Sequence, residues 1–266
     1  YVPYAKESLD HYLLRQPDHY CSHDTTLSMA AKAYSAAKKI DPKTHPKKLL
    51  GIAITASLAT NYAKKGDHKF FIAIQTHEYS HSFSYQFTKG ELSRDEEEAV
   101  VTKYIINALS GACGVSHGIQ DEAPNLRIEK VKAEKSWIKL VDNKIDYVSS
   151  SNHLPELIFP GSFNPFHSGH AEMSELAQKK TGLSPAYEIC IQNADKPPLS
   201  YHEIQRTVLQ FSQSYDWVLT KAGKFSDKAK LFPNSVFIIG ADTLTRMLDE
   251  RFYLNRKDML DQLDLF

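Results

Sequence analysis

Two histidines separated by a serine and a glycine, in the segment His167-Ser-Gly-His170, are the side chains best suited to chemistry. They follow the apolar stretch Leu157-Ile-Phe and precede a helical pattern, so a strand-to-helix corner is expected there. Free backbone N–H groups and the helix dipole favour a phosphate at such a corner. Gly169 leaves room for that phosphate to approach the backbone. We therefore predict a loop in which His167 and His170 act on phosphates; the alternative is that both are ordinary loop residues.

A second loop has the same context, because it follows the apolar stretch Val236-Phe-Ile-Ile239. It contains Gly240 and Asp242, and a helix is expected to start near Thr243. Open α/β sheets bind ligands outside the carboxyl ends of their strands. At this position Asp242 can cap the helix that follows.

The ten residues Gly161-Ser-Phe-Asn-Pro-Phe-His-Ser-Gly-His170 resemble the (His/Thr)-x-Gly-His signature of the nucleotidyltransferase superfamily. The segment Ile239-Gly-Ala-Asp-Thr-Leu244 resembles the Gly-x-Asp segment of its nicotinate and nicotinamide mononucleotide adenylyltransferase branch. The resemblance covers roughly residues 157–250. It implies that the phosphate of a mononucleotide attacks the α-phosphate of ATP, with Mg²⁺ present, and that pyrophosphate leaves.

The same resemblance implies a set of site residues, with His167 and His170 on the triphosphate and Asp242 on a ribose. The predicted nucleotide-binding residues are Gly161, Ser162, Phe163, Gly169, Gly240, Asp242, Lys196 and Lys228. The two lysines are otherwise read as solvated surface residues. The superfamily's later Ser-Ser/Thr-x-x-Arg-like segment is not found before Phe266, so either the chain continues or activity is impaired. A regulatory nucleotide-binding protein, or an enzyme with a pantetheine phosphate or cytidylyl-type reaction, therefore stays open.

Three shorter segments of the first half resemble the C-terminal domain of the CinA family, whose members include nicotinamide mononucleotide deamidases. They are Val2-Pro-Tyr-Ala-Lys-Glu7, Leu50-Gly-Ile-Ala-Ile-Thr-Ala-Ser57 and Gly90-Glu-Leu-Ser-Arg-Asp95. The resemblance implies Tyr4 and Arg94 as site candidates; a solvated charge is the alternative for Arg94. The family's Thr-Ala-Glu-Ser-Cys nucleophile segment would lie before Tyr1, and its Gly-rich loop is altered in Thr55-Ala-Ser-Leu-Ala-Thr-Asn61, which argues against a deamidase.

The segment His77-Glu-Tyr-Ser-His81 matches the metalloprotease pattern H-E-x-x-H, which needs a helix to bring its imidazoles to about 6 Å. Residues 77–87 instead alternate between aromatic or imidazole and small polar side chains, which predicts a strand. Positions four apart in a strand are about 13 Å apart, too far to share one zinc ion. The sequence therefore predicts no metal ligands.

Hydrophobic periodicity predicts the elements that position these segments. Helices are expected over residues 24–40, 169–180 and 201–212, after the capping box of Ser93 and Glu96, and from near Thr243. Strands are expected over residues 49–58, 70–75, 77–87, 157–159, 187–191, 217–220 and 236–239. Met173, Leu176 and Ala177 are expected to face inward from the helix over residues 169–180.

These elements predict an α/β protein with two domains. Residues 1–115 are expected to form a CinA-like α/β domain. Residues 116–155 are expected to form a linker that holds a hairpin, with an alternating stretch over Ser136–Val141 and a turn near Asp142. Residues 156–266 are expected to form a doubly wound, Rossmann-like parallel sheet, with residues 236–239 in its middle.

Bulk composition narrows the classes of partner. Lysine plus arginine and aspartate plus glutamate both total 32, which argues against broad nucleic-acid or membrane-surface binding and leaves small-molecule nucleotides. Three cysteines without a CxxC pair suit the cytoplasm, and no apolar run reaches the ~20 residues that span a bilayer. Homo-oligomer formation stays open. The opening Tyr-Val-Pro-Tyr resembles the middle of a domain, so residues are expected before Tyr1.

Overall fold

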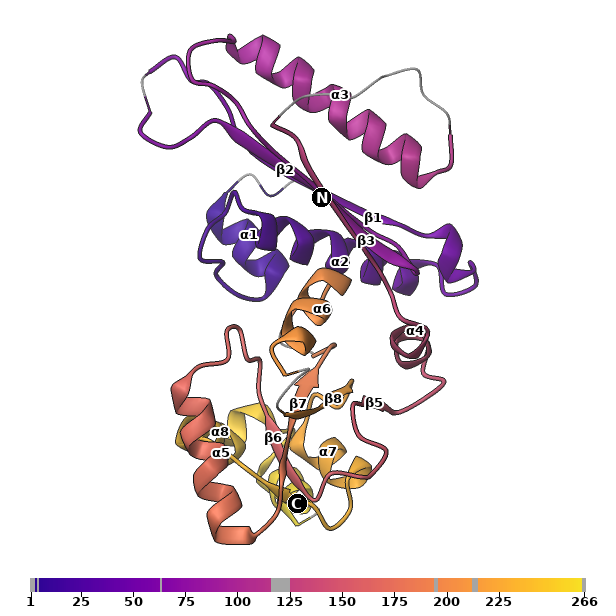
Figure 1. The fold of residues 1–266 in the computed structure, drawn as a ribbon, viewed down its shortest axis with the longest axis vertical. Helices are drawn as coiled ribbons and strands as arrows, with labels where there is room; N and C mark the ends of the chain where they lie inside the picture. The colour runs from indigo at the N-terminus through magenta and orange to yellow at the C-terminus, as the bar shows by residue number, and fades with distance from the viewer. Residues whose placement is uncertain are drawn as a thin grey trace. The chain divides into compact units, whose positions relative to one another are not determined.

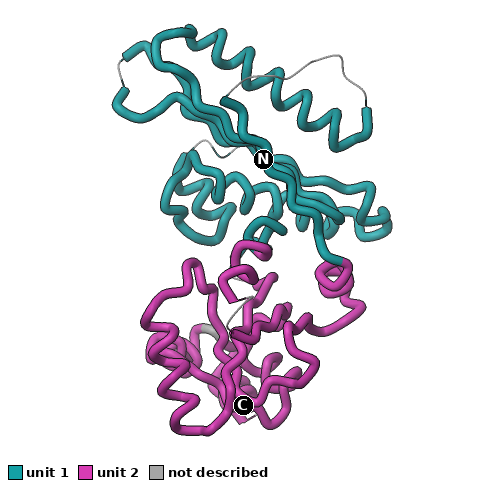
Figure 2. Tube along the Cα trace, in the orientation of Figure 1, with its two compact units in different colours: residues 1–134, 195–203 teal, residues 135–194, 204–266 magenta. Residues whose placement is uncertain are grey.

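The computed structural model describes residues 3, 5–62, 64–115, 125–193, 196–211 and 215–264. Its contacts divide the chain into two compact units (Figure 2): Tyr1–Glu134 with Asp195–Glu203, and Lys135–Ala194 with Ile204–Phe266. Within the described ranges, no helix combines the length and apolar character needed to cross a bilayer.

The first unit is built on an antiparallel sheet in the order β1-β2-β3-β4. The strands are β1 (Gly51–Ser57), β2 (Lys69–Gln75), β3 (Tyr79–Gln86) and β4 (Arg127–Lys132). The helices are α1 (Lys6–Leu13), α2 (His23–Ile40) and α3 (Arg94–Ala112), with a short 3-10 helix η1 (Pro46–Lys48). Helix α3 covers one face of the sheet, and α1 and α2 lie on the other face (Figure 1).

Alternation along β2 explains why both faces of this sheet are covered. Phe70, Ile72 and Ile74 are buried against Val101 and Tyr104 of α3. The intervening Ala73 packs with Leu27, Ala30 and Ala53 on the α2 side. Small residues let α2 approach closely, since a Cβ added to Gly51 would lie 2.2 Å from the Ala30 carbonyl oxygen. The sheet is therefore buried on both faces although it is antiparallel.

The predicted elements of the first unit are largely confirmed. Helix α2 and strands β1, β2 and β3 lie where periodicity predicted them. The capping box is present, with the Ser93 N–H donating to Glu96 Oε2 at 2.7 Å. Since His81 lies within β3, the helix required by the metalloprotease pattern does not form, and the strand interpretation is confirmed.

The segment predicted as a linker with a hairpin is built differently in its described part. Strand β4 completes the first sheet, helix α4 (Lys135–Val141) follows, and β5 (Tyr147–Ser149) joins the second sheet. The alternating interpretation of Ser136–Val141 is wrong. Trp137 and Leu140 are both buried, and their spacing of three places them on one face of a helix.

The second unit holds a sheet in the order β5-β8-β7-β6-β9. Its strands after β5 are β6 (Leu157–Pro160), β7 (Pro185–Cys190), β8 (Asp216–Thr220) and β9 (Val236–Phe237). These four are parallel, and β5 is antiparallel to β8. The helices are α5 (Ser168–Thr181), α6 (Tyr201–Leu209, whose first turn is grouped with the first unit), α7 (Phe225–Leu231), α8 (Ala241–Met247), η2 (Glu250–Phe252) and α9 (Arg256–Leu263).

The strand order reverses beside β6. The chain runs from β6 outward through β7 to β8, then returns to place β9 on the other side of β6. This arrangement agrees with the predicted Rossmann-like sheet, and it makes the β6–β9 boundary the topological switch point.

Two expectations for this unit are wrong. Strand β9 is short and lies at the edge of the sheet, although its apolar sequence suggested the middle. On helix α5 the buried side chain is Ser174, which is 3 % exposed. Met173 and Leu176, which were expected to face inward, are 36 % and 56 % exposed. A small residue is needed at that contact because the ring of Tyr187 fills the space, and its hydroxyl donates to Ser174 Oγ at 2.8 Å.

Candidate functional site

The two motif-bearing loops leave the sheet side by side. Strands β6 and β9 run parallel, with Ile158 opposite Phe237, and the Ile238 N–H donates to the Ile158 carbonyl at 2.8 Å. The loop from Gly161 to His167 and the loop around Gly240 therefore start at the same edge of adjacent strands. Open α/β sheets bind ligands at this edge, beside the switch point.

Backbone contacts and one buried ring shape the first loop. The Gly161 N–H donates to the Glu188 carbonyl at 3.0 Å, which extends the β6–β7 ladder by one step. Phe163 has a positive φ of 42° and is 1 % exposed, so its ring turns back into the unit. A Cβ added to Gly161 would lie 2.5 Å from that ring. Gly161 and Phe163 therefore determine the path of the loop backbone.

A glutamine holds the loop from the side, and the sequence did not single it out. Gln210, just after α6, donates from Nε2 to the Phe163 carbonyl at 3.0 Å. Its Oε1 accepts from the Phe166 N–H at 2.8 Å. One side chain thus satisfies a donor and an acceptor of an irregular segment. Its role requires long-range contact, which local patterns do not reveal.

The two imidazoles of the motif stack on one another at the start of α5. Their ring centroids are 3.7 Å apart, with 29° between the ring planes. His167 caps the helix and is exposed, and its N–H donates to His170 Nδ1 at 3.3 Å. Because Nδ1 accepts, the proton of neutral His170 lies on Nε2, which can donate to an anion. Phe166 stacks against His170 on its other side, with centroids 5.6 Å apart.

The environment of His170 favours the neutral imidazole in the absence of a ligand. Partial burial lowers the pKa of His170 below its ordinary value, and the neighbouring His167 lowers it further. An anion bound beside His170 would act in the opposite direction by favouring the charged form. His170 is therefore suited to take up a proton when a phosphate binds.

Gly169 and Gly240 lie at the starts of helices α5 and α8, and Asp242 lies beside Gly240. A Cβ added to Gly169 would lie 3.3 Å from the His167 ring. A Cβ added to Gly240 would lie 2.7 Å from Asp242 Oδ1, because the carboxylate folds back over that glycine. Asp242 is exposed in the first turn of α8, and Ser162 is exposed in the first loop. Their contacts with nucleotide stay predictions.

The two candidate lysines have different surroundings. Lys228 is buried, and its Nζ lies 2.6 Å from Glu188 Oε2 in an ion pair whose side chains are 5 % and 1 % exposed. The surface interpretation of Lys228 is therefore wrong, and Glu188 links this pair to the backbone of Gly161. Lys196 is exposed, and it belongs to the segment grouped with the first unit. A phosphate contact by either lysine stays a prediction.

The site candidates of the first half are only partly described. Tyr4 lies outside the described residues. Arg94 opens α3, where its Nε lies 2.6 Å from Glu98 Oε1 and its Nη1 donates to the Ala59 carbonyl at 3.1 Å. The guanidinium thus already bonds its own helix and the loop after β1, and a ligand contact stays a prediction.

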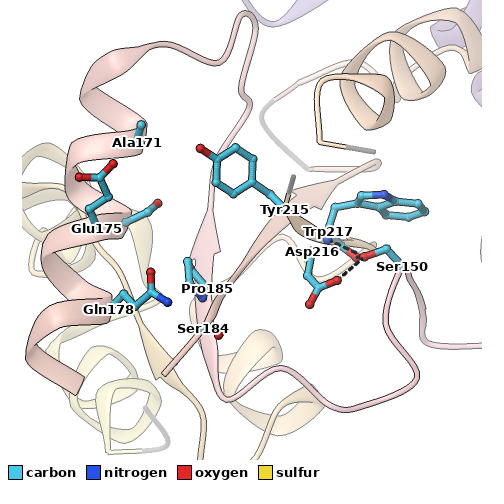
Figure 3. A pocket seen from close by; sticks show the side chains of 10 residues that line it. Ser150, Ala171, Glu175, Gln178, Ser184, Pro185, Tyr215, Asp216 and Trp217 are labelled. Carbon is cyan, nitrogen blue, oxygen red and sulfur yellow. Dashed lines mark hydrogen bonds between the residues drawn. The ribbon is translucent and has the colours of Figure 1, made fainter. Parts of the chain in front are cut away.

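A separate cavity of about 550 Å³ lies in the second unit (Figure 3). It runs from the α5 residues Ser174 and Gln178 to Pro185 and Asp216, the first residues of β7 and β8. It therefore reaches the amino ends of the parallel strands, whereas both motif loops leave the carboxyl ends. Since ligands of such sheets bind at the carboxyl ends, the two loops stay the candidate site.

Comparison with known proteins finds a family model that matches part of the second unit. Residues 158–261 match a family model described as cytidylyltransferase-like. The matched range starts in β6 and ends in α9, so it includes both loops and the crossovers between them. No curated protein and no solved structure matches the chain. The CinA resemblance of the first half stays a prediction.

Proposed function

Starting from a cytidylyltransferase-like domain at residues 158–261, we propose that the second unit transfers a nucleotidyl group from a nucleoside triphosphate to a phosphate-bearing acceptor. One observation carries the proposal: the histidine loop after β6 and the Gly240–Asp242 loop after β9 leave adjacent parallel strands at the switch point. One loop can hold phosphates while the other holds a sugar.

In the proposed reaction, an acceptor phosphate oxygen attacks the α-phosphorus of the triphosphate. The bond from that phosphorus to the bridging oxygen breaks, and pyrophosphate leaves with the electron pair. Negative charge therefore accumulates on the leaving group. His170 Nε2, the exposed His167 ring and the first N–H groups of α5 supply donors for that charge.

Magnesium is proposed to enter as part of the substrate, bound to phosphate oxygens. Mg²⁺ keeps most of its ligands from phosphate and water, so it does not require a dedicated protein cage. It supplies charge neutralisation along the triphosphate. The exposed carboxylate of Asp242 lies at the same sheet edge. We assign it to a ribose hydroxyl, from which a carboxylate can accept a hydrogen bond.

The finer assignment is adenylyl transfer from ATP to nicotinamide or nicotinate mononucleotide. It is supported by the segment Ile239-Gly-Ala-Asp-Thr-Leu244, which resembles the Gly-x-Asp segment of that branch. Cytidylyl transfer to an alcohol phosphate is the second candidate, favoured by the description of the matching family model. A pantetheine phosphate acceptor would use the same loop chemistry.

A substrate panel tests the proposal. The full chain is incubated with ATP or CTP, Mg²⁺ and each acceptor, and pyrophosphate release is followed by product analysis. We expect release that depends on one acceptor and is lost in His170→Ala. His153→Ala, at an exposed histidine of the same unit, is the matched control and should behave as wild type. Triphosphate binding without release for any acceptor would favour a regulatory nucleotide-binding protein.

A further inference from the structure

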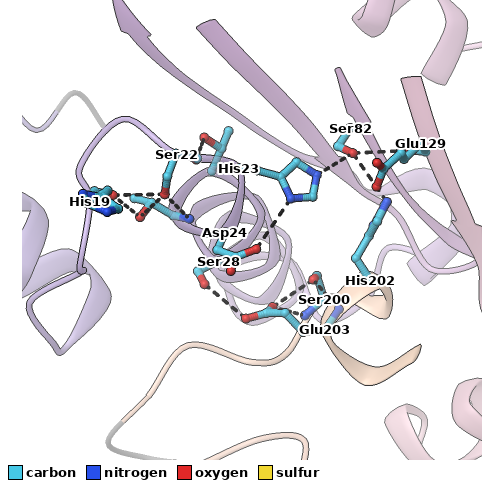
Figure 4. A network of polar contacts seen from close by, with 12 residues as sticks. His19, Ser22, His23, Asp24, Ser28, Ser82, Glu129, Ser200, His202 and Glu203 are labelled. Atoms are coloured by element: carbon cyan, nitrogen blue, oxygen red, sulfur yellow. Dashed lines mark hydrogen bonds and ion pairs between the residues drawn. The ribbon is translucent and has the colours of Figure 1, made fainter. Parts of the chain in front are cut away.

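A second pair of imidazoles meets in the first unit, around a serine hydroxyl (Figure 4). His23 is the first residue of α2, and His202 lies in the segment grouped with this unit. Ser82 Oγ of β3 lies 2.9 Å from His23 Nε2 and 3.4 Å from His202 Nε2. Each ring thus directs its own Nε2 atom toward the Ser82 hydroxyl.

A carboxylate completes the group. Glu129 of β4 is opposite Ser82 in the β3–β4 ladder, so the two side chains share a face of the sheet. One ligand atom from each of His23, Glu129 and His202 lies within 4.8 Å of the other two. Two nitrogens and one oxygen therefore converge from three elements that are distant in the sequence.

The far side of His23 carries an independent indication of the same role. Its Nδ1 lies 3.5 Å from Asp24 Oδ1, on the side of the ring away from Ser82. A carboxylate at Nδ1 keeps the proton there and leaves the Nε2 lone pair available. Histidines that bind metals commonly direct their second nitrogen to a carboxylate in this way.

We propose that His23, His202 and Glu129 bind a divalent transition-metal ion such as Zn²⁺. Ligands about 2.1 Å from a tetrahedral ion are roughly 3.4 Å from each other, so separations of up to 4.8 Å must contract by up to about 1.4 Å. Glu129 is exposed and can rotate inward, while the ion would replace the hydrogen bonds of both rings to Ser82.

The donor set decides the class of metal. Imidazole nitrogens suit zinc, nickel and copper, whereas magnesium and calcium prefer oxygen ligands. Three protein ligands leave one position of a tetrahedral ion open for water or a small ligand. The site is separate from the proposed nucleotidyl transfer, because all of its residues belong to the first unit.

Metal titration of the full chain tests the proposal. After treatment with a chelator and its removal, Zn²⁺ is titrated by calorimetry, and one ion per chain is expected. Glu129→Gln, His23→Gln and His202→Gln should each weaken Zn²⁺ binding at least 100-fold, and Asp24→Asn by about 10-fold. His19→Gln is the matched control, since this exposed histidine lies four residues before His23 in the same unit, and it should bind as wild type.

Two outcomes would overturn the site. The first is a wild-type chain that takes up no Zn²⁺ under these conditions. The second is an equal loss in His19→Gln, or no loss in Glu129→Gln. Because Glu129 is exposed on β4, its substitution should leave the far-ultraviolet circular dichroism unchanged even if His202→Gln perturbs folding.

Discussion

Two imidazole pairs, His167 with His170 and His23 with His202, face opposite kinds of charge. His167 and His170 stack on each other at a helix start, where backbone N–H groups are their neighbours. His23 and His202 meet at a hydroxyl, with the carboxylates of Asp24 and Glu129 beside them.

That difference teaches how surroundings assign a role to the same side chain. An imidazole that binds an anion is favoured by taking up a proton, whereas an imidazole that binds a metal ion must offer its lone pair, and nearby carboxylates supply the negative charge that a cation needs. The first pair therefore suits a triphosphate, and the second suits a metal ion.

The largest effect is expected for the buried Lys228–Glu188 ion pair, because the Glu188 carbonyl accepts the hydrogen bond of Gly161 at the start of the histidine loop. Lys228→Met would leave the Glu188 carboxylate buried without its cation, at a cost of about 3–5 kcal/mol in the free energy of unfolding. Urea denaturation measures this loss. Lys144→Met removes an exposed lysine that pairs with the half-buried Asp142 in the same unit, and it should cost less than about 1 kcal/mol. Equal costs for the two variants would contradict the buried pair.

The next effect is on catalysis by the first pair. His170→Ala removes a donor aimed at the leaving pyrophosphate, so kcat should fall roughly 10²–10³-fold. Steady-state kinetics with the active acceptor measures this fall. A change in KM alone would mean that His170 binds the ground state and the transition state equally well.

A smaller effect tests whether loop shape matters. Gln210→Ala removes two hydrogen bonds from the loop, each worth about 0.5–1.5 kcal/mol, so kcat/KM should fall roughly tenfold. Gln178→Ala, in the cavity of Figure 3, is the matched control and should leave kcat/KM unchanged. If Gln178→Ala were the more damaging change, the cavity would replace the loop as the site.

The smallest effect is a difference in pH dependence between the two pairs. The pKa of His170 is held below its ordinary value, and a bound triphosphate should raise it, so binding takes up protons. Triphosphate affinity should therefore rise as pH falls from about 7.5 to 6, roughly threefold more in wild type than in His170→Gln. Zn²⁺ binding should weaken over the same range, because protons compete for imidazole nitrogens. Calorimetry at both pH values measures each trend, and an equal trend in wild type and His170→Gln would contradict the assignment.

The histidine loop could be predicted from sequence because it is contiguous. His167 and His170 are joined by one turn of chain, and the flanking apolar strand and helix pattern fix their context. Strand β3 was equally readable from its period of two.

The rest depends on contacts between distant segments. Strand pairing and helix packing bring together the contacts of Gln210, the Lys228–Glu188 pair and the His23–Glu129–His202 group. Such contacts leave no local pattern in the sequence. Helix α4 was read as a strand because Ile138 and Leu140, two residues apart, fit a period of two, whereas Trp137 and Leu140, three residues apart, fit a helix. Burial of both side chains decides for the helix.

The most direct test of the central claim is a crystal structure with a non-hydrolysable triphosphate. The account predicts phosphate oxygens within hydrogen-bonding distance of His170 Nε2 and of the first N–H groups of α5. Phosphates located only in the cavity beside Ser174 and Trp217, or a loop without bound phosphate, would contradict it.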